Sequence, residues 1–150
     1  MRLSVATPLA IVVEADDVVH VRAEDDSGAF GILRGHADFL TALAVSVVSW
    51  RDGRGIEHHA AVRAGVLQVR GGETVEIATP EAVRGDDLHQ LETDVVTRFR
   101  RQLSDEQAAR TDAQRLYLAA MRQIVHFLRG QRQVSIPGST AAGSNESLES

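Results

Sequence analysis

The sequence predicts a mixed β + α fold in which an N-terminal antiparallel β-sandwich is followed by a C-terminal α-helical hairpin. Up to about residue 85, apolar and polar residues alternate in short runs that glycine-containing turns separate. From Asp86 onward, apolar residues instead recur every three or four positions. We therefore expect a β-sandwich domain over 1–85, a helical hairpin over 86–130 and a disordered tail over 131–150, where Ser, Gly and Ala predominate.

The predicted strands are rich in valine, whose branched side chain favours extended backbone. Turns are expected at RDGRG (51–55) and RGGE (70–73), where glycine permits the tight reversal that a hairpin needs. About eight to ten short strands fit into this region, a spacing typical of an antiparallel sandwich or barrel rather than a parallel sheet. The clearest strands are VVHVRAE (18–24), AVSVVSW (44–50), GVLQVRG (65–71) and TVEIAT (74–79).

The helical hairpin is predicted from its apolar stripes. Asp86 and Asp87 precede the first helix, where a carboxylate can accept hydrogen bonds from free backbone amides. The sequence LSDEQ (103–107) is expected to break the helix, with Ser104 or Asp105 capping a second helix that Gly130 ends. The second helix has an unusually broad apolar face, which indicates two packing partners. The first stripe consists of Leu88, Leu91, Val95, Phe99 and Leu103, and the second helix carries Ala113, Leu116, Ala120, Ile124 and Phe127 beside Tyr117, Met121, Val125 and Leu128.

Composition and charge narrow the classes of function. The chain has no cysteine, which excludes disulfides and thiolate metal sites, and no apolar run approaches the ~20 residues that span a bilayer. We expect no signal peptide, because acidic residues follow soon after Met1. The net charge of −5 is unevenly spread, with −8 over residues 1–97 and +5 over residues 98–132. Because so acidic a body repels phosphates, we expect no nucleic-acid binding.

A glycine-rich stretch, GAFGILRGHADFLTAL (28–43), invites comparison with phosphate-binding loops. A Walker-type loop needs a lysine beside its last glycine, and the chain contains no lysine. A dinucleotide-binding loop needs a surrounding βαβ unit, which the pattern of strands does not provide. We therefore interpret Gly28, Gly31 and Gly35 as glycines of tight turns or close backbone approach, in an apolar loop of the kind that meets a partner.

The sequence offers no catalytic or metal-binding constellation. His58 and His59 are adjacent, so on a strand they would point to opposite faces. No pair of histidines has the helical spacing of a zinc site, and no serine lies in a G-x-S-x-G context. We expect no catalytic residue, no metal and no cofactor. The paired carboxylates, which fall at turns and caps, are Asp16/Asp17, Asp25/Asp26 and Asp86/Asp87.

The basic helical segment has two open interpretations. Its arginines, among them Arg98, Arg100, Arg101 and Arg122, either solvate the helix pair or bind carboxylates of an acidic protein partner. Docking on a membrane surface is disfavoured, because anionic lipid would repel the acidic domain.

Three motifs in the same order give the chain a resemblance to the epsilon subunit of F-type ATP synthases, over residues 3 to about 129. GILRGHADFLTAL (31–43) resembles the family's G-I-x-P-G-H-A-x-L-L-T-A-L signature. AGVLQVRGGETVEIAT (64–79) is similar to its strand-pair motif, and EAVRGDDL (81–88) to the segment that leads into its first helix. The helices resemble those of the alternative ATPase operon that some bacteria carry.

The resemblance implies a non-catalytic rotor subunit of the central stalk, which couples the membrane c-ring to the catalytic head through the gamma subunit. It implies regulation of ATP hydrolysis by the hairpin, with the catalytic beta subunits as a further partner, and a peripheral place on the cytoplasmic face of the bacterial membrane, held only through the complex. It also implies three surfaces. These are a ring-facing loop of Gly31, Ile32, Arg34, Gly35 and His36, a packing face toward gamma or within the hairpin of Leu116, Tyr117, Met121, Ile124 and Leu128, and a basic surface of Arg98, Arg100, Arg101 and Arg122.

The chain departs from the family pattern at particular positions. Ala29 stands where many members have an acidic residue, and Arg34 stands where they have proline; an arginine suits carboxylates or carbonyls on a ring loop. Some members hold ATP between the helices with an Asp and an Arg, which His89 and Glu92 replace here, so we expect no ATP binding. The alternative, from a different class of function, is a free-standing β-sandwich module for protein interaction.

Overall fold

The computed structural model describes residues 1–134, with side chains described up to residue 131. The chain divides into two compact units, residues 1–106 and residues 107–150. The first unit contains every strand of the described residues and the start of the helical region. Of the predicted disordered tail, residues 135–150 lie outside the described residues, whereas residues 131–134 are helical.

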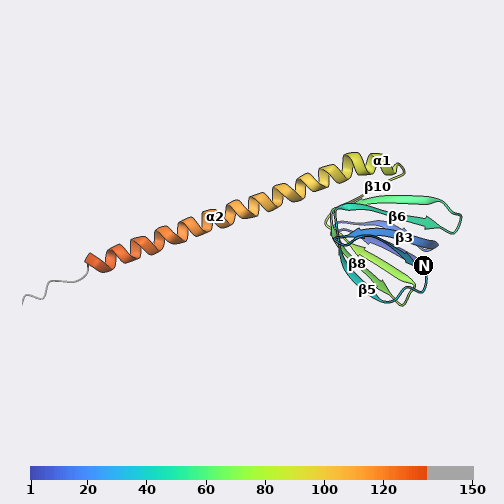
Figure 1. The fold of residues 1–150 in the computed structure, drawn as a ribbon, viewed down its shortest axis with the longest axis horizontal. Helices are drawn as coiled ribbons and strands as arrows, with labels where there is room; N and C mark the ends of the chain where they lie inside the picture. Colours follow the sequence, from blue (N-terminus) through green and yellow to red (C-terminus); the bar gives the residue numbers. More distant parts are fainter. Residues whose placement is uncertain (135–150) are drawn as a thin grey trace, which may run out of the picture. The chain divides into compact units, whose positions relative to one another are not determined.

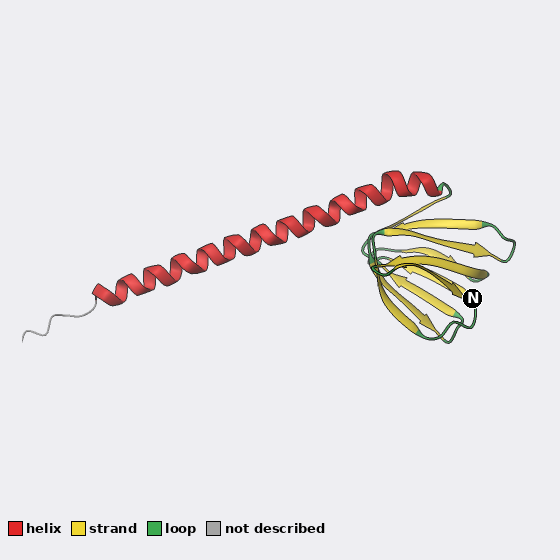
Figure 2. Ribbon diagram, viewed as in Figure 1, coloured by secondary structure: helices red, strands yellow, loops and turns green. Residues whose placement is uncertain are grey.

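Strands account for most of the first 85 residues, as the alternating pattern predicts (Figures 1 and 2). Each of the four strands singled out in the sequence is present within two residues of its expected bounds. The strands are β1 (Arg2–Ala6), β2 (Ile11–Ala15), β3 (Val18–Asp25), β4 (Gly28–Leu33), β5 (Phe39–Leu43), β6 (Ser46–Asp52), β7 (Glu57–Val62), β8 (Gly65–Arg70), β9 (Thr74–Ala78) and β10 (Ala82–Gly85).

The strands form two layers, and among the described strands one pair, β3 and β5, joins them. The first layer has the order β10-β7-β6-β3, with β4 on the other side of β3, and the second has the order β5-β8-β9-β1-β2. The layers join where β3 meets β5, through the pair Asp25 and Leu43. Pairing is antiparallel except between β1 and β9, which run parallel. The predicted antiparallel β-sandwich is confirmed, with this one parallel pair added.

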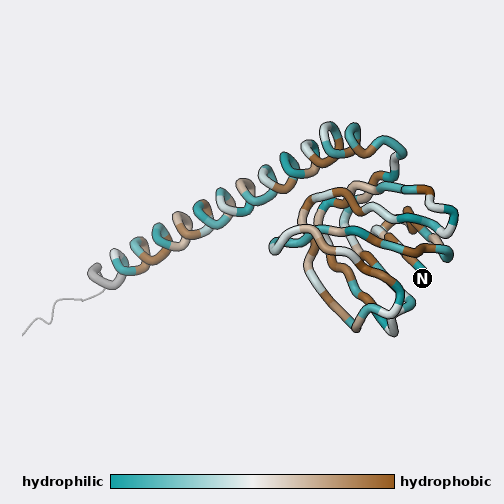
Figure 3. The backbone as a smooth tube through the Cα atoms, turned by 45° about the vertical axis from the view of Figure 1, so that its right-hand side comes forward, coloured by the Kyte–Doolittle hydropathy of each residue, from teal (hydrophilic) through white to brown (hydrophobic). Residues whose placement is uncertain are grey.

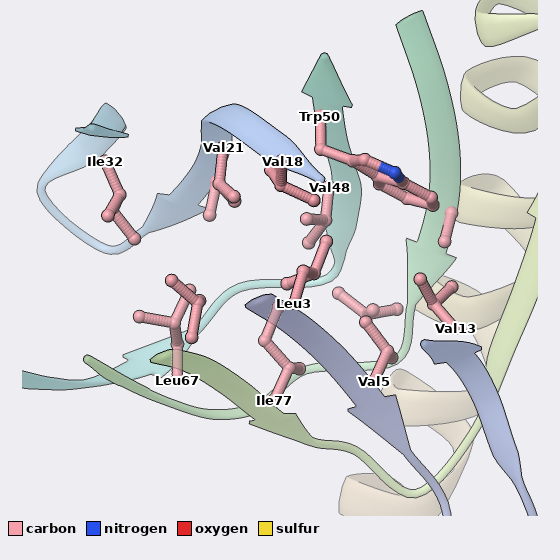
Figure 4. Close-up of a cluster of buried hydrophobic side chains, with 14 of the residues drawn as sticks. Leu3, Val5, Val13, Val18, Val21, Ile32, Val48, Trp50, Leu67 and Ile77 are labelled. Carbon is pink, nitrogen blue, oxygen red and sulfur yellow. The ribbon is translucent and has the colours of Figure 1, made fainter. Parts of the chain in front are cut away.

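The core lies between the two layers and is made mainly of branched aliphatic side chains. Figure 4 shows Val21, Ile32 and Val48 of one layer facing Leu3 and Leu67 of the other. All five side chains are completely buried. Each comes from the inward-facing positions of its strand, so the alternating pattern that predicts the strands also predicts which face they bury.

The helical region begins at the expected cap. Asp87 accepts a hydrogen bond from the Gln90 backbone N–H at 3.2 Å and opens α1 (Leu88–Gln90), which continues into a π-helical segment, η1 (Leu91–Val96). The wider π turn rotates the apolar stripe, so Val96 is buried and Val95 only half-buried. Within the first unit, the buried side chains of this region cover the outer face of the first layer: Leu91, Val96 and Phe99 pack with Val45 and Ala61.

The predicted hairpin is not found; a single helix, α2 (Thr97–Val134), runs through the expected break (Figure 1). The sequence LSDEQ (103–107) contains neither glycine nor proline, and a serine or aspartate inside a helix costs only a few tenths of a kcal/mol. Gly130 does not end the helix either, because one glycine costs only about 1 kcal/mol in a helix interior. No helix among the described residues is long and apolar enough to cross a membrane.

Candidate functional site

The glycine motif of the sequence forms strand β4 and the loop that follows it, residues 34–38, which carries the chain from the first layer to β5 of the second. Gly35 has φ = 83°, a left-handed conformation that glycine adopts without strain. The His36 backbone N–H donates to the Leu33 carbonyl at 3.1 Å and closes a turn. The His36 imidazole lies against Phe39, with ring centroids 5.8 Å apart. The loop therefore has a defined shape.

The β8–β9 turn, residues 71–73, lies directly against this loop. The Gly35 N–H donates to the Gly72 carbonyl at 2.9 Å, and the Gly71 N–H donates to Asp38 Oδ1 at 2.8 Å. Arg34 Nε lies 3.5 Å from Glu73 Oε1. We refer to residues 34–38 and 71–73 together as the docking edge. The sequence does not indicate the contacts of Asp38 and Glu73, because partners more than 30 positions away leave no local signal.

The predicted ring-facing residues differ in where their side chains lie. Arg34 and Gly35 are exposed on the docking edge, and His36 is half-buried. Ile32 is completely buried in the core, so it anchors β4 and has no side-chain surface to offer a partner. Gly31 is exposed on β4, where a Cβ atom would lie 2.8 Å from Nε2 of His20. Of the predicted residues, Arg34, Gly35 and His36 thus lie in the loop, whereas Gly31 and Ile32 lie in β4, the strand that leads into it.

The β6–β7 turn lies at the same end of the strands as the docking edge and contains Asp52, a carboxylate whose pKa is well below its ordinary value. Asp52 Oδ2 accepts a hydrogen bond from His58 Nε2 at 3.1 Å, and Oδ1 accepts from the backbone N–H groups of Arg54 and Ile56. These bonds favour the ionised form, and the bond from His58 contributes most, so the pKa of Asp52 is lowered to about 2. Asp52 is a structural anion that holds a turn.

The outer face of the second layer carries an exposed apolar row that the sequence analysis did not identify. The strand registers place one residue from each of the five strands directly beside the next. Ile11 is 61% exposed and Val66 is 45% exposed. The neighbouring rung is mostly polar, with Gln68, Glu76, Ser4 and Glu14, but it begins with Leu40, which is 67% exposed. We define the apolar row as Ala42, Val66, Ala78, Ala6 and Ile11, in that order across β5, β8, β9, β1 and β2.

The second unit presents the apolar residues predicted to pack against gamma or within the hairpin. All of them lie on α2 and are exposed, and Figure 3 shows hydrophobic positions recurring along this part of the helix. Of the predicted basic surface, Arg122 lies in the second unit, whereas Arg98, Arg100 and Arg101 lie in the first; all four are exposed, and Arg98 lies 3.7 Å from Glu81. The exposed fractions on the apolar face are 73% for Leu116, 65% for Tyr117, 43% for Met121, 53% for Ile124 and 54% for Leu128.

A polar cavity of about 380 Å³ lies within the first unit, between the outer face of the first layer and the start of the helical region. The charges that line the cavity cancel, because two arginines, Arg22 and Arg100, stand against two glutamates, Glu24 and Glu92. A balanced lining does not favour a polyanion such as a nucleotide triphosphate. Among the described residues, no group of three or more His, Asp or Glu side chains is arranged to hold a metal ion.

Comparison with known proteins identifies the family. The model of the ATP synthase delta/epsilon chain β-sandwich domain matches residues 1–85. The ATP synthase epsilon chain 2 of Paraburkholderia xenovorans (strain LB400) is 43% identical over 132 residues, which cover 88% of this chain and 95% of that protein. The ATP synthase epsilon chain 2 of Cereibacter sphaeroides is 37% identical over 149 residues, or 99% of each chain.

Solved structures share the fold. A chain in the Euglena gracilis mitochondrial ATP synthase, determined with OSCP, F1 and the c-ring, has a TM-score of 0.54 and 21% identity, covering 71% of this chain and 62% of that one. A chain in the central stalk and c-ring of the Tetrahymena thermophila mitochondrial ATP synthase has a TM-score of 0.51 and 16% identity, covering 63% and 71%. The matched sandwich and the identity along most of the chain agree: this chain belongs to the ATP synthase epsilon chain family.

Proposed function

We propose that this chain is a non-catalytic subunit of the central stalk of a bacterial F-type ATP synthase, where it couples the membrane c-ring to the catalytic head through gamma. The observation that carries the proposal is the docking edge, in which the family's signature motif forms a braced loop with Arg34 and Gly35 exposed. The solved structures that share the fold are assemblies that contain a c-ring, which supports the same role.

The docking edge suits the polar loops of a c-ring. Arg34 is the exposed cation there, and its side chain is 68% exposed although Glu73 lies beside it. A guanidinium offers several donors in a fixed plane and binds carboxylates or carbonyl oxygens. The subunit would thus meet the ring by hydrogen bonds and charge, and would lie at the cytoplasmic face of the membrane only through the complex.

The apolar row on the second layer suits the gamma subunit. Four of the five residues in this row are exposed and Ala6 is half-buried, so the row is larger than the scattered apolar residues of an ordinary surface, and it lies on a paired sheet. The exposed apolar face of α2, which includes Leu116, Tyr117 and Met121, offers gamma a second surface. The sandwich over 1–85 would hold the rotor contacts, and the helical region over 86–130 would add the second contact.

Regulation of hydrolysis is assigned to the basic part of α2. Arg98, Arg100 and Arg101 are exposed, and guanidinium groups pair with carboxylates, so an acidic segment of the catalytic beta subunits is the fitting partner. Changing all three arginines to glutamate is expected to alter ATP hydrolysis by the assembled enzyme, measured with an enzyme-coupled assay. Unchanged hydrolysis would remove this regulatory role and leave the stalk role intact.

Co-expression with the gamma subunit of the same genome, followed by size-exclusion chromatography, tests the stalk assignment. We expect a stable one-to-one complex. Val66→Arg, which places a charge in the apolar row, should weaken the complex at least about tenfold, because the interface would bury an unpaired guanidinium. Gln68→Arg, two residues along the same face of β8, should leave the complex intact.

The outcomes separate the candidate functions. Two folded proteins that do not co-elute would contradict the stalk role and favour a free-standing β-sandwich interaction module. A complex that tolerates Val66→Arg would preserve the stalk role and place the gamma contact elsewhere.

A further inference from the structure

We propose that the β8–β9 turn is the second half of the docking edge and acts as the template that holds Arg34, Gly35 and His36 in their binding shape. In this view Gly72 and Asp38 are positioning residues for the loop. The inference rests on the proposed contact with the c-ring, and it deepens that contact by assigning it a second segment of the chain.

The first argument is that two hydrogen bonds connect the loop to the turn. The Gly35 N–H, in the middle of the loop, donates to the carbonyl of Gly72 in the turn at 2.9 Å. In the opposite direction, the Gly71 N–H donates to the Asp38 carboxylate at 2.8 Å. A hydrogen bond at each end of the contact fixes both the position and the orientation of the loop against the turn.

The second argument is that the approach is too close for any residue but glycine. A Cβ atom on Gly72 would lie 2.7 Å from Gly35 Cα, closer than real Cβ atoms approach backbone, and 3.0 Å from Gly35 N, which is also unusually tight. Gly72 is buried even though it belongs to a surface turn. The loop backbone therefore rests directly on the turn backbone, and a side chain at Gly72 would displace it.

The third argument is that the turn is itself held in place. The Arg2 N–H donates to the Glu73 carbonyl at 2.8 Å, and β8 and β9 pair up to Arg70 and Thr74 on either side of the turn. The template is thus fixed by the second layer of the sandwich. A preformed loop loses less conformational freedom when it binds, which increases affinity without adding a contact.

The fourth argument concerns charge. Glu73 lies 3.5 Å from Arg34, so the guanidinium is held near the turn. A partner that meets Arg34 meets Glu73 in the same approach, which favours a partner loop with both carbonyl or carboxylate acceptors and N–H or hydroxyl donors over a purely acidic surface.

A pair of glycine variants tests the template. Gly71 and Gly72 both have left-handed φ, 61° and 67°, but a Cβ atom on Gly71 would have no heavy atom within 4 Å. Gly71→Ala thus carries the same backbone cost as Gly72→Ala without displacing the loop. The measurement is the affinity of the full-length chain, in complex with gamma, for the c-ring of the same bacterium in lipid nanodiscs, by biolayer interferometry.

We expect Gly72→Ala to bind the ring about tenfold more weakly than Gly71→Ala, with equal co-elution with gamma and similar melting temperatures. Equal ring affinities of the two variants would overturn the inference. If the wild-type complex itself does not bind the c-ring, the proposed ring contact fails and the inference falls with it, so the two failures are distinguishable.

A second pair keeps the inference testable if Gly72→Ala does not fold. Asp38→Ala removes the acceptor for the Gly71 N–H, whereas Asp38→Asn keeps an oxygen at the same place. We expect Asp38→Ala to weaken ring binding several-fold and Asp38→Asn to restore it. Identical affinities for these two variants would show that the bond between loop and turn does not position the docking edge.

Discussion

At the scale of single residues, Asp52 shows how a turn of this sandwich depends on an ionised side chain. Its pKa is lowered from 3.8 to about 2, chiefly by the hydrogen bond from His58 and also by the N–H groups of Ile56 and Arg54. A group whose pKa is lower in the folded state stabilises that state above its unfolded pKa, and this stabilisation is lost as the pH falls through the folded value. The stability that ionised Asp52 contributes to the folded state is therefore lost as the pH falls from about 4 to about 2.

Replacing Asp52 should show this window directly. Asp52→Asn keeps an oxygen for the backbone donors but loses the negative charge that faces His58, so the variant should be less stable than the wild type at pH 7. The difference should close as the pH falls from 4 to 2, because the wild-type carboxylate is then protonated as well. Urea unfolding followed by circular dichroism across this range makes the comparison, with Asp26→Asn at another hairpin turn as control. If the stability difference between the wild type and Asp52→Asn were unchanged at pH 2, the stabilising role of ionised Asp52 would be contradicted.

The sequence identifies the local residues of the docking edge but not the contacts that shape it. The resemblance of residues 31–43 to the family's signature motif implies a ring-facing loop that includes Arg34, and this motif can be recognised because its residues are consecutive. Glu73 and Asp38 could not be assigned, since their partners come from another hairpin and only the fold brings them together. Ile32 belongs to the predicted ring-facing residues because it lies within the family's signature motif, yet its side chain is buried. Adjacent residues of a strand point to opposite faces of the sheet, and Ile32 is one that points into the core.

At the scale of elements, strands were easier to predict than helix ends. Valine alternation specifies both the strand and its buried face, and glycine marks the turns. The expected break at 103–107 rested on Ser104 and Asp105, which favour caps but are also accepted inside a helix. Of the two expected caps, Asp86 and Asp87, which precede the helical apolar stripe, Asp87 is the one that accepts a hydrogen bond from the Gln90 N–H.

The apolar face of α2 gives an element-scale prediction. Met121→Asp should leave the melting temperature of the free chain nearly unchanged, because the side chain is 43% exposed. In the complex with gamma it should weaken association at least about tenfold, since a charge would be buried without a partner. Gln123→Asp introduces the same residue two positions along the helix and serves as control. Equal binding of both variants by size-exclusion chromatography would remove this face from the gamma contact.

At the scale of the whole molecule, we predict that the first folded unit extends beyond the β-sandwich to residue 106, and truncation tests this. The family model of the β-sandwich matches residues 1–85, yet Leu91, Val96 and Phe99, which follow it, are buried on the outer face of the first layer. A chain ending at Gly85 should thus be less stable than one ending at Glu106, by roughly 5 kcal/mol for the three side chains. Urea unfolding of the two chains measures the difference. Equal stabilities would mean that the helical region adds nothing to the sandwich.

The path of the docking loop has a mechanical consequence. Residues 34–38 leave β4 of the first layer and enter β5 of the second, and among the described strands the two layers pair directly only where β3 meets β5. In the proposed stalk role, a sideways load from the ring on residues 34–38 would be divided between the two layers from the moment it enters the protein. The interlocked side chains of Val21, Ile32 and Leu67 would resist this load as shear, so the stiffness of the proposed coupling would be set by the packing of the core.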